Sequence, residues 1–137
     1  MDFLSRRILI SSFFIFSCCI AFFIILIHKE FSENKILDFF LYVFCGPFLE
    51  TIIYQFLIQE VGLRFKWDKK FSIAFSWVAF LLAHTGGVVR MVIPGLLGGG
   101  VLAVTYGLSR KYGRGYAFVI TFMVHAAWNS CVILFLS

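Results

Sequence analysis

Five apolar runs, each about as long as a membrane span, alternate with short polar connections along this chain. They occupy residues 8–27, 36–63, 71–89, 91–109 and 116–136. A helix needs about 20 predominantly apolar residues to cross the hydrocarbon core of a bilayer. The pattern therefore predicts an all-α membrane protein, a bundle of about five transmembrane helices surrounded by the lipid bilayer.

The composition agrees with this prediction. Of the 137 residues, 61% are hydrophobic and 14% are charged, whereas soluble domains are about 45–50% apolar and about 25% charged. The chain has room for one compact domain and no soluble module. Its net charge of +5 comes from basic residues in the short connections, not from a basic face interleaved with aromatic side chains. We therefore expect no nucleic-acid partner.

The basic residues are divided unequally between the two sides of the predicted bundle. Nine of the twelve lie before the first run or in the second-to-third and fourth-to-fifth connections, and three lie on the other side. The positive-inside rule then predicts a cytoplasmic amino terminus. We expect the first run to be a retained span, because it exceeds a typical signal-peptide core and no small-x-small cleavage site follows it.

One carboxylate lies deep in an apolar run, that of Glu50, and the imidazoles of His84 and His125 lie in two other runs. Counted from the predicted cytoplasmic ends at ~1.5 Å per residue, the three lie roughly 14–20 Å deep. A charged side chain at the bilayer centre costs about 3 kcal/mol on insertion scales. Burying an acid and two imidazoles only to join helices is costly, which favours a buried polar functional site.

These residue types allow two kinds of chemistry. A carboxylate beside neutral imidazoles can take a proton from water, and an imidazole with an amide N–H can stabilise an oxyanion. A site with both functions can hydrolyse a carbonyl compound. Two histidines and one glutamate are also a zinc-type ligand set with an open fourth position. The four cysteines have no paired spacing, and we interpret them as packing residues.

Local features of the second run add predictions about Glu50. Pro47 is expected to kink the helix and free backbone carbonyls near Glu50. Thr51 and Gln55 are four residues apart and share a helix face. Because Glu50 points about 100° away from Thr51, we expect Glu50 to face a cavity while Thr51 and Gln55 brace the helix against a neighbour.

In the fourth run, small residues recur every four positions: Gly95, Gly99, Ala103 and Gly107. Such a stripe lets a neighbouring helix approach closely in lipid, so we assign it packing and no chemistry. Pro94 predicts a helix start near Ile93, because proline is favoured at the first helical positions.

Three short motifs resemble the CPBP intramembrane proteases, which include type II CAAX prenyl endopeptidases and bacterial Abi proteins linked to bacteriocin processing and immunity. The family pattern is Glu-Glu-x-x-x-Arg, then Phe-x-x-x-His, then His-x-x-x-Asn, on separate membrane helices. The matching positions here are Glu50, Thr51 and Gln55, then Phe80 and His84, then His125 and Asn129. The resemblance covers about residues 41–133. It implies a protease core of four transmembrane helices in residues 35–137, preceded by a transmembrane helix and loop in residues 1–34.

The resemblance implies an intramembrane endopeptidase of a bacterial cytoplasmic membrane that hydrolyses a peptide bond of a peptide or membrane-associated substrate. Glu50 would be the general base, and His84 would help to hold the attacking water. His125 and Asn129 would form the oxyanion site, and Phe80 would pack within its motif. We expect no metal or other cofactor, with zinc bound by Glu50, His84 and His125 as the alternative.

Two positions depart from the family pattern, because Thr51 replaces the second glutamate and Gln55 replaces the arginine. These two neutral groups are able to share a hydrogen bond, and we interpret the replacement as a changed support of the helix. The change leaves open a catalytically inactive member that acts as a membrane immunity or partner-binding protein. A proton or ion pathway is less favoured, because no chain of ionisable groups crosses the predicted bundle.

Overall fold

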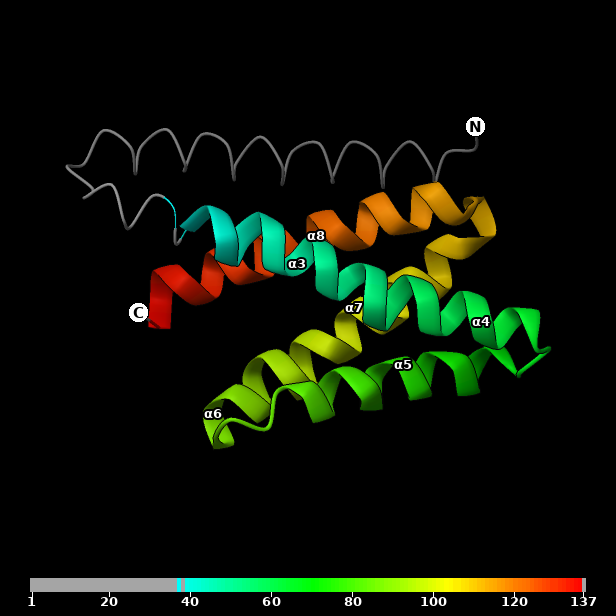
Figure 1. Ribbon diagram of the computed structural model, residues 1–137, viewed down its shortest axis with the longest axis horizontal. Helices are drawn as coiled ribbons and strands as arrows, with labels where there is room; N and C mark the ends of the chain where they lie inside the picture. Colours follow the sequence, from blue (N-terminus) through cyan, green and yellow to red (C-terminus); the bar gives the residue numbers. More distant parts are fainter. Residues whose placement is uncertain (1–36, 38, 137) are drawn as a thin grey trace.

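The computed structural model describes Leu37 and residues 39–136, apart from the side chains of Arg90 and of residues 134–136. All the regular elements in this part of the chain are helices (Figure 1). The predicted first span at residues 8–27, and the whole predicted N-terminal segment 1–34, lie outside the described residues.

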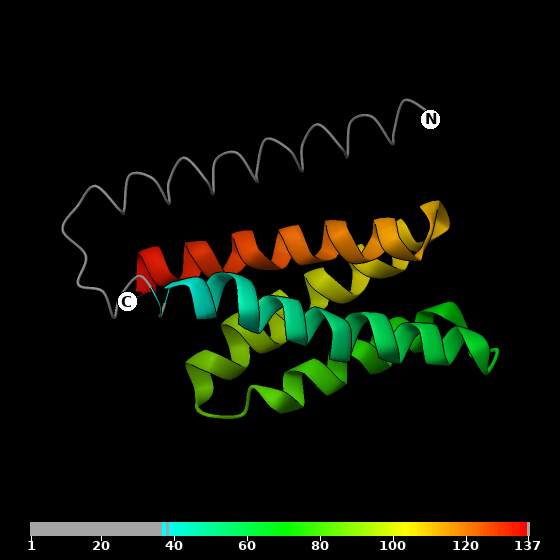
Figure 2. The same ribbon diagram turned by 45° about the horizontal axis from the view of Figure 1, so that its top comes forward.

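The described chain runs back and forth through one helical bundle (Figures 1 and 2). The first helix is continuous through η1 (Leu41–Cys45), α3 (Gly46–Glu50), η2 (Thr51–Leu57) and α4 (Ile58–Arg64). The chain returns through α5 (Lys69–Ala83). It runs forward again through α6 (Val88–Arg90), η3 (Met91–Gly98) and α7 (Gly99–Ser109). The turn η4 (Arg110–Tyr112) then leads into α8 (Arg114–Leu136).

Three of these helices are long and apolar enough to cross a membrane. They are Leu41–Arg64, Met91–Tyr112 and Arg114–Ile133. Their outward surfaces carry many exposed leucine, valine and phenylalanine side chains, which suits contact with lipid and not with water. The prediction of an all-α membrane protein is confirmed.

The predicted span at residues 71–89 is wrong in its extent. The helix in this region, α5, has 15 residues and is followed by His84 as its C-terminal cap residue. Gly87 has φ 135°, a backbone conformation that glycine adopts far more readily than other residues. The chain therefore turns at residues 84–87, and His84 lies at a helix end instead of inside a span.

The predicted helix start near Ile93 is also wrong. The helix begins at Val88, and Pro94 lies inside the π-helical segment η3. A proline removes one backbone N–H, but membrane helices tolerate it when local π-type adjustment re-satisfies the freed carbonyls. The proline rule for helix starts therefore does not hold at this position.

The small-residue stripe of the fourth run packs as predicted. Gly95, Gly99, Ala103 and Gly107 are all buried, and α7 packs against both α5 and α8. A Cβ placed on Gly99 would lie 2.6 Å from Cδ1 of Phe80 in α5. The absence of a side chain at this position thus sets how closely α5 and α7 approach.

We expect Gly99→Ala to lower the free energy of unfolding by about 1–3 kcal/mol, because the buried Phe80 ring has to move to admit a methyl group. Gly115→Ala is the matched control, since a Cβ there has nothing within 4 Å. The measurement is the thermal unfolding midpoint in detergent. Equal midpoints for the two variants would show that the stripe does not limit helix approach.

Candidate active site

The three predicted site residues from separate runs meet in the structure. Glu50 ends α3, His84 follows α5, and His125 lies in α8. Oε2 of Glu50 is 3.3 Å from Nε2 of His125 and 4.0 Å from Nε2 of His84. The Glu50 side chain is 33% exposed and that of His125 is 3% exposed, so the carboxylate is open on one side while its nearer imidazole is enclosed.

The end of α5 fixes the ring of His84. The backbone N–H of His84 bonds to Leu81, which leaves the Phe80 carbonyl without its usual donor four residues on. Nδ1 of His84 lies 2.9 Å from this carbonyl oxygen. A carbonyl only accepts, so Nδ1 carries the hydrogen in this contact. A neutral ring then presents a bare Nε2 lone pair to Glu50.

His84 and Glu50 thus face each other as two acceptors. A carboxylate and an imidazole lone pair do not bond directly, and their atoms are 4.0 Å apart. One water between them can donate a hydrogen to each. This pair therefore suits a water molecule that keeps its oxygen lone pairs free.

His125 has the opposite arrangement. Nε2 faces Glu50 Oε2 at 3.3 Å, and an ionised carboxylate is an acceptor, so Nε2 carries the hydrogen. Nδ1 of the neutral ring is then an acceptor for the hydroxyl of Thr51, whose Oγ1 is 3.2 Å away. Thr51 and His125 are 0% and 2% exposed, so no water competes for this bond. Glu50 therefore lies between a donor ring and an acceptor ring.

Phe80 packs between the two imidazoles, as the motif implied. The side chain is 1% exposed. Its ring stacks on His84 with centroids 4.3 Å apart and meets the edge of His125 at 5.6 Å. Because buried rings resist displacement, Phe80 limits the rotation of both imidazoles.

Asn129 contacts the first helix instead of the carboxylate. Its Nδ2 donates to the carbonyl oxygen of Tyr42 at 2.9 Å. The backbone N–H of Gly46 donates to the carbonyl oxygen of Leu41, five residues earlier, as in a π-helix. With the same spacing, the N–H of residue 47 would donate to the carbonyl oxygen of Tyr42. Residue 47 is a proline and has no N–H, so this carbonyl lacks its backbone donor. Pro47 therefore frees a carbonyl, but it is that of Tyr42, eight residues before Glu50, and not one near Glu50 as predicted. The helix continues through Pro47, and Asn129 is the partner of the freed carbonyl.

Thr51 and Gln55 do not form the hydrogen bond that their spacing allows. Each bonds to a different neighbouring helix, Thr51 to His125 in α8 and Gln55 to Ser76 in α5. Their side chains point outward from the helix axis into the bundle, and both are 0% exposed. The prediction that they brace the helix against its neighbours is confirmed.

Two residues of this support were missed by sequence reasoning. The hydroxyl of Ser76 is 2.5 Å from Oε1 of Gln55 and 2.7 Å from the carbonyl of Tyr54. Nε2 of Gln59 donates to the carbonyl of Ala103 at 3.0 Å. The signal was available, because Thr51, Gln55 and Gln59 recur every four residues as a polar stripe on an otherwise apolar helix.

A metal site is not formed by the residues that were its candidates. Within the described part of the chain, no group of three histidine, cysteine or acidic side chains is arranged to hold a metal ion. Of the cysteines, Cys45 and Cys131 are free thiols. We therefore derive no reaction step through zinc.

We expect Thr51→Val to lower the free energy of unfolding by about 1–3 kcal/mol, because the valine has a similar shape but leaves Nδ1 of buried His125 without a donor. Thr51→Ser keeps the hydroxyl and is the matched control. Thermal unfolding in detergent measures both. A valine variant as stable as the serine variant would contradict the Thr51 to His125 bond.

The comparisons with known proteins agree with the three motifs. No curated protein and no solved structure matches the chain. A family model described as type II CAAX prenyl endopeptidase Rce1-like matches residues 32–131, a stretch that contains every motif residue described above. The match covers well over half of the chain. This protein therefore belongs to the Rce1-like type II CAAX prenyl endopeptidase family, a family of membrane-embedded proteases.

Proposed function

We propose that this protein is an active intramembrane endopeptidase in which Glu50 is the general base. The observation that carries the proposal is the position of Glu50 Oε2 between Nε2 of His125 at 3.3 Å and Nε2 of His84 at 4.0 Å. The family supplies the reaction class, hydrolysis of a peptide bond in a peptide substrate at the membrane. The chemistry of the three side chains supplies the roles.

The reaction begins with a water held by Glu50 and His84. Glu50 removes one proton as the water oxygen attacks the substrate carbonyl carbon, and His84 Nε2 accepts a hydrogen bond from the remaining O–H. A C–O bond forms and the carbonyl oxygen becomes an oxyanion. When this tetrahedral intermediate collapses, the C–N bond breaks and protonated Glu50 returns its proton to the leaving amine.

His125 is the donor whose interaction changes during the reaction. Before attack, Nε2–H faces the negative carboxylate of Glu50. Once Glu50 is protonated, the oxyanion is the stronger acceptor nearby, so the hydrogen bond is worth most in the transition state. Asn129 uses one amide hydrogen on Tyr42, and we assign its second hydrogen to the same oxyanion.

The departures from the family pattern are compatible with activity. Thr51 supplies the donor that His125 Nδ1 needs if Nε2–H is to face Glu50. Gln55 joins the first helix to α5 through Ser76. Two neutral side chains therefore support the site at positions where the family pattern has charged ones, and neither removes a group that touches the reacting atoms.

The basic side chains support an orientation for the site. In the described chain all of them except Arg90 gather at the end of the bundle where α4 meets α5 and α7 meets α8: Arg64, Lys66, Lys69, Lys70, Arg110, Lys111 and Arg114. The positive-inside rule places this end at the cytoplasm. Together with the expected span at residues 8–27, this leads us to propose a cytoplasmic amino terminus.

We expect Glu50→Gln to abolish proteolysis and leave the unfolding midpoint close to that of the wild type, because glutamine keeps the shape but cannot take a proton from water. The measurement compares new protein amino termini in membranes that express either form at equal levels. A chelator arm tests the zinc alternative, and we expect cleavage to persist in it.

Three results would change this account. Cleavage by the Glu50→Gln variant would exclude Glu50 as the base. Loss of wild-type cleavage under chelation, with recovery on adding zinc, would favour the metal mechanism. No new termini with folded wild-type protein would favour the alternative function, an inactive family member that acts as a membrane immunity or partner-binding protein.

A further inference from the structure

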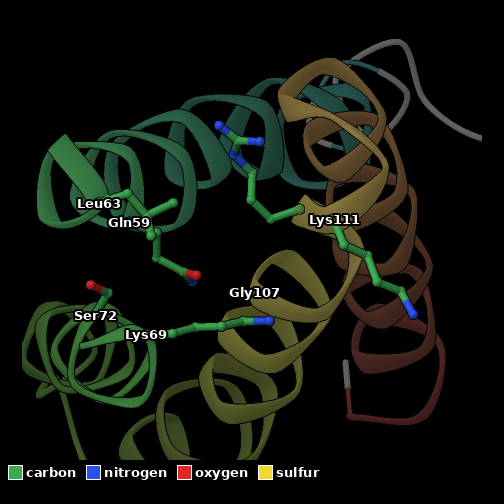
Figure 3. Close-up of a pocket in the computed structure, with 7 residues that line it drawn as sticks. Gln59, Leu63, Lys69, Ser72, Gly107 and Lys111 are labelled. Atoms are coloured by element: carbon green, nitrogen blue, oxygen red, sulfur yellow. The ribbon is translucent and has the colours of Figure 1, made fainter. Parts of the chain in front are cut away.

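A hollow lies at the basic end of the bundle, away from Glu50. It has a volume of about 240 Å³ and is formed where α4, α5 and α7 meet η4. Gln59, Leu63, Lys69, Ser72 and Gly107 line it, together with the first residues of η4 (Figure 3). Its wall is mixed, because an apolar leucine and a bare glycine backbone stand beside cationic and hydroxyl groups.

Lys69 supplies the uncompensated charge of this pocket. Its side chain extends across the opening toward Gly107 (Figure 3). No described acidic side chain forms an ion pair with it. The adjacent carboxylate of Asp68 is used in capping α5, where Oδ1 accepts from the backbone N–H groups of Lys70 and Phe71. Lys69 is an exposed residue. It is therefore a cation at the edge of a partly apolar hollow, with no acidic partner among the described residues.

The other two cations of the pocket have partners of their own. Arg110 forms a two-pronged ion pair with Glu60, with Nη2 3.0 Å from Oε2. Nζ of Lys111 lies 4.8 Å from the ring centroid of Tyr112. These groups add positive potential to the pocket, while Lys69 remains the one that can bind a ligand without first losing a contact.

Ser72 supplies a buried hydroxyl in the same pocket. It is 2% exposed, and its Oγ has no hydrogen-bond partner in the described part of the chain. Ser72 is three residues after Lys69 on α5, so the two side chains share one helix face. A buried polar group without a partner is costly. The Oγ is closed off in this structure and lies against Gly62, so the serine side chain has to rotate before a ligand with acceptor oxygens can satisfy the hydroxyl and the ammonium together.

A neighbouring hollow extends the positive region. It has a volume of about 400 Å³, shares Leu63 and Arg110 with the first, and is also lined by Arg64 and Arg114. Its only acidic lining residue is Glu60, which is paired. Leu63 and Val61 also line this hollow and are 39% and 43% exposed.

From this combination we propose that the pocket binds the phosphate of an anionic phospholipid headgroup, with Lys69 and Ser72 as the binding residues. The ammonium and hydroxyl match phosphate oxygens. The pocket lies at the basic end of the membrane spans. The positive-inside rule puts this end at the cytoplasmic side, where the leaflet carries anionic lipid. The exposed apolar residues of α4 continue from the pocket toward the bilayer, so acyl chains can follow them. Free phosphate offers the same oxygens and is separated from lipid by experiment.

The test titrates purified full-length protein in neutral detergent with phosphatidylglycerol and measures the bound lipid and the unfolding midpoint. Parallel arms use phosphatidylcholine, glycerol 1-phosphate and inorganic phosphate. We expect phosphatidylglycerol to bind and to raise the midpoint, and the other three to do so far less. Because one lysine near a membrane surface is worth about a five-fold change in affinity, we expect that loss in Lys69→Gln.

Lys70→Gln is the matched control, since it removes the same charge from the next residue, which does not line the pocket. We expect its affinity to stay within about two-fold of the wild type. Ser72→Ala should weaken lipid binding without lowering the midpoint of the lipid-free protein, because its hydroxyl has no partner to lose.

Equal effects of Lys69→Gln and Lys70→Gln would overturn the proposal and indicate diffuse charge attraction. Unchanged lipid binding in Ser72→Ala would exclude a phosphate seated in the pocket. Equal binding of inorganic phosphate and phosphatidylglycerol would identify an anion site and exclude lipid as its specific ligand. None of these results bears on Glu50, so this proposal stands or fails apart from the proposed proteolysis.

Discussion

The structure depends on one constraint, the presence of an ionisable carboxylate within the apolar layer of a helical bundle. Glu50 meets that constraint through its neighbours, because His125 offers a hydrogen and His84 leaves room for a water. The enclosed side of the carboxylate faces an imidazole that is 3% exposed, while Glu50 itself is one-third exposed. The same asymmetry that stabilises the acid leaves it accessible to a reactant.

Interruptions in regular helix geometry build this arrangement. The end of α5 leaves the Phe80 carbonyl free, and that carbonyl orients His84. Pro47 leaves the Tyr42 carbonyl without a backbone donor, and the side chain of Asn129 in α8 donates a hydrogen bond to it. In lipid each free backbone group needs a partner inside the protein. The positions at which the helices break therefore decide which polar side chains are held and in which direction.

The sequence predicted the meeting of Glu50, His84 and His125, because motif order and similar depth from three separate runs both pointed to it. It could not predict the orientation of their rings. The ring of His84 depends on where α5 ends, and His84 itself is the C-terminal cap residue of that helix. In the apolar run at residues 71–89, two adjacent glycines are the main sequence signal for the turn after α5.

Other errors have the same origin in helix geometry. Pro94 was expected to begin a helix, as proline does in water, but a π-helical segment accommodates it. The four-residue spacing of Thr51 and Gln55 allowed a hydrogen bond between them, because a sequence shows which residues share one helix face and does not show which helices pack together. Their real partners lie on α8 and α5, and such contacts between helices depend on packing that a single sequence does not contain.

The most direct test of the account is the protonation pattern of the two site histidines, measured by nitrogen NMR on the protein labelled with ¹⁵N-histidine in lipid. A His28→Gln background and single variants of His84 and His125 would assign the signals. The account predicts two neutral rings of opposite tautomer, with the hydrogen on Nδ1 of His84 and on Nε2 of His125. Two rings of the same tautomer would contradict a carboxylate placed between a donor and an acceptor.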